Sequence, residues 1–337
     1  MMHYLKQYGG LFLALFFGAV PSAWALDCYK NGATSGAQNA LEQIMISPLG
    51  IPADTPVGTK IWESEIINVT AHCGRVQKNV VYENVYFYFN PRGPNLDSAS
   101  GLAFGLEVIS PVQQDLDNPS ARFDTGRTVY RIASQGPTWI DVPVSFRLYL
   151  KTTRLPNNAE RPITGNYAGP NVFQAFQFDG VKGVNIVQGT NLRYDLTNLR
   201  NIKFLACGAD VSVLPENQDV DFGSQHLANF SSQGELTRNF TLRAVRRGCA
   251  DTFSIDLRLD PKMATVNNQF LDLNNGLQIG IYDQGKRVDF GKYYPFVSFS
   301  GNNFADKTFE AKLTKIPGRE VKVGPFNASL IYRINYK

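Results

Sequence analysis

Residues 324–337 read GPFNASLIYRINYK, and this stretch decides the predicted fold of the C-terminal half of the chain. Its apolar side chains alternate without interruption, at Phe326, Ala328, Leu330, Tyr332, Ile334 and Tyr336. A period of two places them on one face of a β-strand. Alternation alone favours an ordinary last strand of a β-sandwich.

The same period of two runs through the rest of the chain. Between residues 140 and 150 the even positions are apolar, whereas Asp141, Ser145 and Arg147 are polar. Residues 82–89, 102–109 and 129–133 are further predicted strands, and turn-forming clusters separate such segments. Only residues 37–45 are predicted to be helical. The pattern predicts an all-β protein built of two β-sandwich domains.

Length and composition limit the function. A chain of 337 residues predicts two ordinary domains or one large one. The net charge is +4, from 33 basic and 29 acidic residues, which does not indicate a nucleic-acid partner or a membrane surface. With three histidines, a His-rich metal site is not expected. We expect no cofactor and no metal.

The first 25 residues are predicted to be a signal peptide. Lys6 precedes an apolar run, LFLALFFGAV at residues 11–20, which is too short to cross a bilayer. Ala23 and Ala25 then occupy the positions that a signal peptidase reads. Cleavage after Ala25 would leave an exported chain that begins at Leu26.

Export into an oxidising compartment makes disulfides the default state of the four cysteines. Four cysteines allow three pairings. The pairing of nearest neighbours, Cys28 with Cys73 and Cys207 with Cys249, closes loops of similar size. A zinc site is the competing interpretation, but no CxxC spacing is present.

The C-terminal stretch resembles that of subunits assembled by the chaperone–usher pathway of Gram-negative bacteria. In that family a glycine lies fourteen places from the end and a tyrosine is penultimate, which Gly324 and Tyr336 match. The segment VDFG at residues 220–223 resembles the family's common segment between two cysteines. The family's bridge between early strands would be supplied by Cys207 and Cys249.

This resemblance implies an immunoglobulin-like sandwich that lacks its last strand. A periplasmic chaperone would first donate a strand to this sandwich and anchor the carboxylate of Lys337. At an outer-membrane usher, the next fimbrial subunit would then replace the chaperone's strand with its own. The expected groove residues are Gly324, Phe326, Ala328, Leu330, Tyr332, Ile334, Tyr336 and Lys337.

The predicted mature N-terminus indicates the position in the fimbria. A subunit that donates a strand needs an N-terminal extension before its first cysteine. In the predicted mature chain only Leu26 and Asp27 precede Cys28. The chain therefore resembles a two-domain tip adhesin of the type 1 or type 3 kind, exported through the periplasm to the fimbrial tip at the bacterial cell surface. The expected division is residues 1–25 signal peptide, 26–202 receptor-binding adhesin domain and 203–337 pilin domain.

The adhesin domain is expected to bind a host glycan or a matrix protein. Proteins bind sugars by packing an aromatic ring against the C–H face of the sugar and by hydrogen bonds from a few polar side chains. The candidate receptor-binding residues are Arg122, Asp124 and Arg127 in a loop before a strand, Trp139 at the start of a strand, and Asn166 and Tyr167 in a Gly-flanked loop.

An enzyme is not expected, because no spacing singles out a catalytic pair or triad, and no catalytic residue is assigned. Two alternatives stay open. One is a structural minor subunit or assembly initiator without a receptor of its own. The other is a secreted β-sandwich glycan hydrolase.

Overall fold

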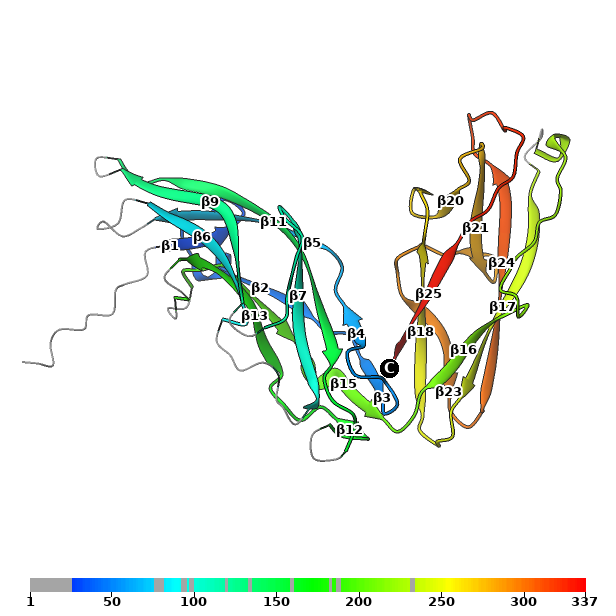
Figure 1. Ribbon diagram of the computed structural model, residues 1–337, viewed down its shortest axis with the longest axis horizontal. Helices are drawn as coiled ribbons and strands as arrows, with labels where there is room; N and C mark the ends of the chain where they lie inside the picture. Colours follow the sequence, from blue (N-terminus) through cyan, green and yellow to red (C-terminus); the bar gives the residue numbers. More distant parts are fainter. Residues whose placement is uncertain are drawn as a thin grey trace, which may run out of the picture.

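The computed structural model describes residues 26–75, 82–91, 96, 100–118, 121–132, 135–157, 161–181, 184–185, 189–230 and 234–337. The predicted signal peptide, residues 1–25, lies outside them. The described residues form β-strands and short 3₁₀ turns gathered in two β-sandwiches (Figure 1), so the predicted all-β fold class is confirmed. No helix of the described residues is long and apolar enough to cross a membrane.

The first sandwich packs two sheets face to face. Its first sheet has the order β1-β5-β11-β7-β8, with β4 also paired to β11, and its second has the order β10-β9-β6-β13-β14-β2. The strands of the first sheet are β1 (Leu26–Lys30), β5 (Ile67–Arg75), β11 (Trp139–Thr152), β7 (Leu102–Ser110), β8 (Gln114–Leu116) and β4 (Lys60–Glu63). Those of the second are β10 (Gly136–Pro137), β9 (Arg122–Ile132), β6 (Tyr82–Phe89), β13 (Val172–Gly180), β14 (Arg193–Thr197) and β2 (Leu41–Met45).

Alternation along the strands creates the first core. On β11 the even residues from Val142 to Leu150 are buried, and on β6 the odd residues Val85, Phe87 and Phe89 are fully buried. The rings of Phe87 and Phe176 lie 4.1 Å apart between their centroids. Each buried phenylalanine contributes about 1.5–3 kcal/mol to folding. The opposite residues of β6 consequently face outward.

The second sandwich has one sheet in the order β16-β17-β24-β21-β20-β19, with β22 paired to β21. Its strands are β16 (Ala209–Leu214), β17 (Leu236–Arg246), β24 (Phe304–Lys315), β21 (Leu277–Asp283), β20 (Phe270–Asp272), β19 (Thr265–Val266) and β22 (Lys286–Arg287). The facing strands are β25 (Leu330–Tyr336), β18 (Phe253–Pro261) and β23 (Tyr294–Phe299). This second sheet continues into the first half of the chain through β3 (Leu49–Pro52), β15 (Ile202–Leu205) and β12 (Gly165–Asn166).

The buried apolar residues form two clusters that meet between Phe204 and Leu205. The first cluster holds no residue beyond Phe204 and the second begins at Leu205 among the described residues. The predicted division between residues 202 and 203 lies two residues before this point and stays a proposal.

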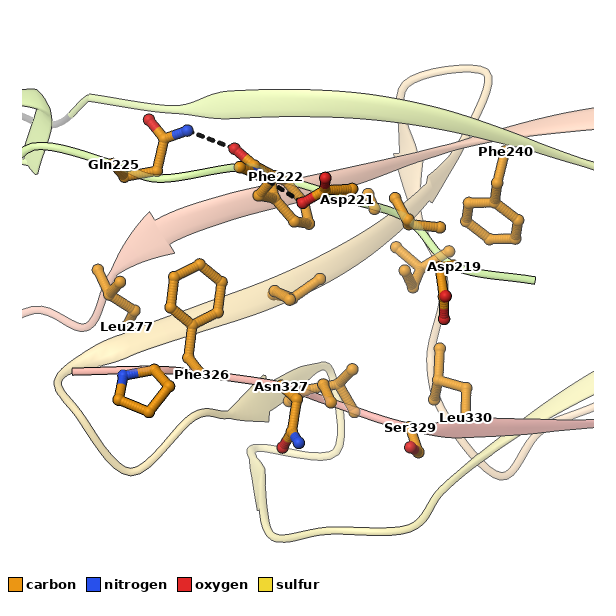
Figure 2. Close-up of a pocket in the computed structure, with 18 of the residues that line it drawn as sticks. Asp219, Asp221, Phe222, Gln225, Phe240, Leu277, Phe326, Asn327, Ser329 and Leu330 are labelled. Carbon is orange, nitrogen blue, oxygen red and sulfur yellow. Dashed lines mark hydrogen bonds between the residues drawn. The ribbon is translucent and has the colours of Figure 1, made fainter. Parts of the chain in front are cut away.

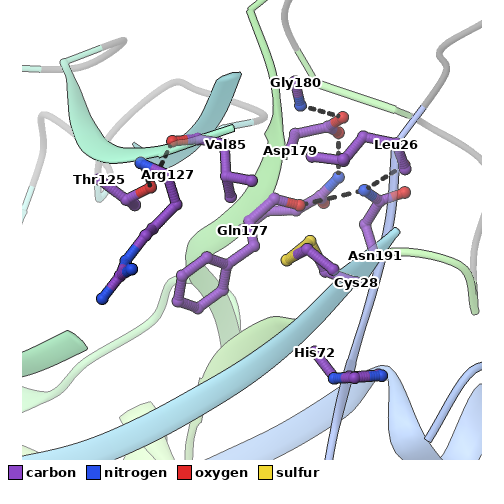
Figure 3. Close-up of a disulfide and its surroundings, with 12 residues drawn as sticks. Leu26, Cys28, His72, Val85, Thr125, Arg127, Gln177, Asp179, Gly180 and Asn191 are labelled. Atoms are coloured by element: carbon purple, nitrogen blue, oxygen red, sulfur yellow. Dashed lines mark hydrogen bonds between the residues drawn. A yellow bond between two sulfur atoms is a disulfide. The ribbon is translucent and has the colours of Figure 1, made fainter. Parts of the chain in front are cut away.

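Both nearest-neighbour disulfides are present, so the predicted pairing is confirmed. Cys28 of β1 lies directly opposite Cys73 of β5, with 4.1 Å between their Cα atoms. Figure 3 shows this bridge beside buried polar side chains of the first sandwich. Cys207 is joined to Cys249, with 5.9 Å between their Cα atoms. The two bridges therefore lie in different sandwiches.

Three local predictions differ from the structure. Residues 37–45 are not an α-helix, because only Ala37–Asn39 form a 3₁₀ turn and β2 pairs in parallel with β14. Arg122, Asp124 and Arg127 lie on β9 rather than in a loop, since β9 begins at Arg122 and pairs with β6. The last strand begins at Leu330 rather than Phe326, because its ladder with β18 starts at the pair Leu330–Pro261.

Candidate functional site

The C-terminal strand β25 has one paired edge and one open edge. Along one side it forms a continuous antiparallel ladder with β18, from Leu330 to Tyr336. On the other side, the described residues provide a single partner, Gly50 of β3 opposite Tyr336. β16 likewise ends the facing sheet, since it pairs with β17 alone in the described topology. Two sheet edges therefore face each other without a strand between them.

A groove of about 1260 Å³ lies between these two edges (Figure 2). This volume exceeds the 300–1,000 Å³ typical of small-molecule sites and suits an extended peptide. Figure 2 shows Phe222 and Phe240 on one wall and Phe326 and Leu330 on the other. Its apolar lining comes from both sheets: Val213, Phe240, Leu242, Leu259, Leu271, Leu277, Ile279, Ile281, Ala311, Phe326, Ala328, Leu330 and Tyr332.

Two tyrosines of β25 span the end of the groove. The hydroxyl of Tyr336 donates to the carbonyl oxygen of Ala209 at 2.9 Å and accepts from the Ala209 amide at 3.0 Å. The hydroxyl of Tyr332 donates to the carbonyl of Val211 at 2.7 Å. Burial raises the pKa of Tyr336, which keeps its hydroxyl protonated. These bonds tie β25 to β16 and fix the separation of the two groove walls at this end.

The residues before β25 continue the same wall without a ladder. Phe326 and Ala328 are partly buried against the second core. Gly324 has φ +156, a backbone conformation that residues with a side chain rarely adopt, so glycine suits the point where the chain enters the wall. At the other end, the Lys337 amide and carbonyl pair with Ser254, and its ammonium group contacts the carboxylate of Asp256. Ile334 and Tyr336 also pack against the second core, so the predicted groove residues lie along one path.

An open edge of this kind can bind a strand. Its unpaired N–H and C=O groups offer main-chain hydrogen bonds, and the groove offers apolar contacts to alternate side chains of an incoming segment. Left open, the same edge is an aggregation hazard. The edge and the groove together are therefore suited to the binding of an added strand.

In the first sandwich, two of the predicted receptor residues lie together on the outer face of β9. Arg122 donates to the Val181 carbonyl at 3.0 Å and lies over the Tyr86 ring at 4.6 Å. Asp124 lies directly opposite Tyr86, and its carboxylate accepts from the Gly126 amide at 2.9 Å. Arg127 is exposed at the irregular pairing that follows.

The other predicted receptor residues lie elsewhere. Trp139 is on the outer face of the opposite sheet, where its ring stacks on His72 at 5.4 Å. It lies against Gly74, whose added Cβ would come 2.4 Å from the indole. Asn166 is exposed on β12, whereas Tyr167 is only 3% exposed and packs in the first core. The six residues therefore do not form one surface.

Sequence reasoning did not nominate the tyrosines that surround Arg122 and Asp124. Tyr82, Tyr86 and Tyr88 lie on the side of β6 that faces away from the first core, where Tyr88 is only 7% exposed, and Tyr130 lies opposite Tyr82. The signal was present in the sequence YENVYFYF, where tyrosine occupies outward positions of a predicted strand.

A buried polar cluster lies beside the Cys28–Cys73 bridge (Figure 3). Asp179 accepts hydrogen bonds from the Gly180 and Asn185 amides and from the Gln177 side chain. Burial raises the pKa of Asp179 to about 7 despite these bonds. Asn191 donates to the Leu26 carbonyl at 3.0 Å and so fixes the start of β1. Among the described residues no group of three or more His, Cys, Asp or Glu could hold a metal ion.

Comparison with known proteins agrees with the architecture of the second sandwich. Residues 211–337 match the family model described as fimbrial protein. This part of the chain is similar to fimbrial proteins. The predicted resemblance to fimbrial subunits is thus confirmed over this part of the chain.

Solved structures of fimbrial proteins are also similar. The P pilus rod subunit PapA is 19% identical, with 38% of this chain and 99% of that chain covered and a TM-score of 0.32. The CupB6 tip adhesin from Pseudomonas aeruginosa is 15% identical, with coverage of 92% and 94% and a TM-score of 0.30. The complex of the chaperone CsuC with the tip subunit CsuE, from Acinetobacter baumannii, matches at 10% identity, with coverage of 91% and 99% and a TM-score of 0.24.

Proposed function

We propose that this protein is a fimbrial tip adhesin, which attaches bacteria to host surfaces through its first sandwich and joins the fimbria through its second. The observation that carries the proposal is the open edge of β25 above an apolar groove, within residues that match the fimbrial family model. The proposed role is binding and anchoring, without catalysis.

A donated strand would complete the second sandwich. Placed beside β25, it would bond to the free main-chain groups of Leu330 to Asn335 and direct alternate side chains toward the groove. We propose that a periplasmic chaperone supplies this strand first and holds the Lys337 carboxylate. At an outer-membrane usher, the next subunit would then replace the chaperone.

The N-terminal strand supports a position at the tip. β1 pairs residue by residue with β5 from Leu26 to Lys30, and Cys28 is bridged to Cys73. A strand held in this way is not available for donation to another subunit. We propose residues 26–202 as the receptor-binding domain and residues 203–337 as the pilin domain. After export, both domains would lie at the cell surface.

A synthetic donor-strand peptide tests the anchoring role. With alternating apolar residues it should raise the melting temperature of the full chain, because it fills the groove, and a peptide of the same composition in scrambled order should not. Removal of residues 326–337 should abolish chaperone binding. An unchanged melting temperature, together with intact chaperone binding after the deletion, would refute the proposal.

Receptor binding needs a separate test. We propose a host glycan as the receptor, and binding of the full chain to a glycan array or to host cells should detect it. A chain that binds its chaperone but neither glycans nor cells would instead be a structural minor subunit. Release of sugar from a polysaccharide by the purified chain would identify a hydrolase.

A further inference from the structure

The outer face of β6 and β9 carries four cross-strand pairs in a row: Tyr82–Tyr130, Asn84–Thr128, Tyr86–Asp124 and Tyr88–Arg122. We call these eight residues the tyrosine face. It lies opposite the core face of the same strands, where Val85, Phe87 and Phe89 are fully buried. We propose that the tyrosine face binds an extended, uncharged oligosaccharide; this inference rests on the proposed receptor-binding function and names its site and ligand class.

Two rings of the tyrosine face are exposed. Tyr82 is 63% exposed and Tyr130 is 52% exposed, and their ring centroids lie 6.5 Å apart at an interplanar angle of 43°. Rings this exposed add little to the core. Aromatic side chains gathered on a surface are enriched at binding sites, where an apolar ring and a polar hydroxyl act together. The two tilted rings offer apolar planes to the C–H groups of a sugar.

The tyrosine face carries no net formal charge. The two charged groups of the tyrosine face are already engaged within the protein. The Arg122 guanidinium bonds to the Tyr88 hydroxyl at 3.4 Å and to the Val181 carbonyl at 3.0 Å, and it covers the Tyr86 ring. The Asp124 carboxylate accepts from the Gly126 amide. The face carries one positive and one negative group, so its charge complements a neutral ligand better than a sialylated or sulfated one.

The tyrosine face also has a positioned hydrogen-bonding group. The Thr128 hydroxyl donates to the side-chain amide oxygen of Asn84 at 2.8 Å. Among the described residues this bond orients the amide and leaves its nitrogen as a donor beside the Tyr82–Tyr130 pair. A positioned amide next to aromatic rings is the combination that sugar hydroxyls and C–H faces require.

The tyrosine face is an open strip along two strands. From Tyr82 to Tyr86 the rings are four residues apart on one strand, or about 13 Å. A strip of that length fits several consecutive sugar units rather than a single ring in a pocket.

The test is glycan-array binding by the full chain, by two single variants and one double variant of the tyrosine face, and by two control variants. Tyr82→Ala and Tyr130→Ala should each weaken binding of neutral oligosaccharides by about tenfold, and the double variant by roughly a hundredfold. Because both rings are exposed, the melting temperature should not change. Tyr293→Ala is the matched control, since this tyrosine is 43% exposed in the second sandwich. Trp139→Ala, on the opposite sheet, should also bind like the wild type.

The outcomes separate the inference from the function beneath it. Wild-type binding by the double variant, loss with Trp139→Ala alone, or binding confined to anionic glycans would overturn the inference and leave the receptor function intact. Loss of binding to a host protein rather than to glycans in the double variant would overturn the ligand class. A wild-type chain that binds neither glycans nor cells would refute the receptor function itself.

Discussion

The hydroxyl of Tyr336 offers a direct test of how the groove walls are held. Tyr336→Phe removes a group that both donates to the Ala209 carbonyl and accepts from the Ala209 amide across the groove. Each such bond contributes about 0.5–1.5 kcal/mol net. The substitution should therefore lower the free energy of unfolding of the second sandwich by about 2 kcal/mol.

Tyr332→Phe is the matched control, because among the described residues the Tyr332 hydroxyl makes one hydrogen bond, to the Val211 carbonyl. It should destabilise the same unit by about 1 kcal/mol. In calorimetry of the full chain, roughly 4 °C per kcal/mol gives shifts of about 8 °C and about 4 °C. The unfolding transition of the second sandwich is identified as the one whose melting temperature a donor-strand peptide raises. Equal shifts for the two variants, or no shift for Tyr336→Phe, would refute the proposed attachment of β25 to β16.

Three further predictions concern stability. Burial raises the pKa of Asp179 from 3.8 to about 7, so the folded state binds the carboxyl proton more tightly than the unfolded state does. The free energy of unfolding should therefore fall as pH rises between these two values. In Asp179→Asn the urea concentration at the unfolding midpoint should depend less on pH over this range. Gly105→Ala would place a Cβ 2.1 Å from the Tyr149 ring and should destabilise the chain by about 1–3 kcal/mol in urea unfolding, and a neutral result would mean that the ring moves aside. Arg247 and Asp54 form an exposed ion pair at 2.7 Å, so a double-mutant cycle should give a coupling below about 1 kcal/mol, and a larger value would contradict solvent screening.

Much of the fold could be predicted because its strands bury one face. The alternation over residues 140–150 and 82–89 reports burial directly, and the structure places strands β11 and β6 there. The last strand was predicted four residues too long, because the periodicity continues through Phe326 and Ala328, which contact the core without pairing. The 37–45 prediction was wrong because parallel pairing of β2 with β14 depends on a strand more than 140 residues away.

The proposed receptor surface was harder to predict, because it depends on which strands become neighbours. Sequence proximity placed Arg122 and Asp124 together, and the structure adds tyrosines from β6 that no spacing along β9 could indicate. Tyr167 shows the opposite case, since glycines on both sides predicted an exposed loop but its ring fills a space in the first core. Its hydroxyl would lie 2.2 Å from a Cβ at Gly169, so the neighbouring glycine makes room for the ring.

The separation into two cores has a spectroscopic consequence. Of the three tryptophans in the chain, Trp24 precedes the described residues, and Trp62 and Trp139 both belong to the first sandwich. Residues 205–337 contain none. Intrinsic tryptophan emission of a chain that begins at Leu26 therefore follows the first sandwich, while tyrosine absorbance and heat capacity follow both. Tryptophan fluorescence is therefore an intrinsic probe of which sandwich unfolds first in the absence of a donor-strand peptide.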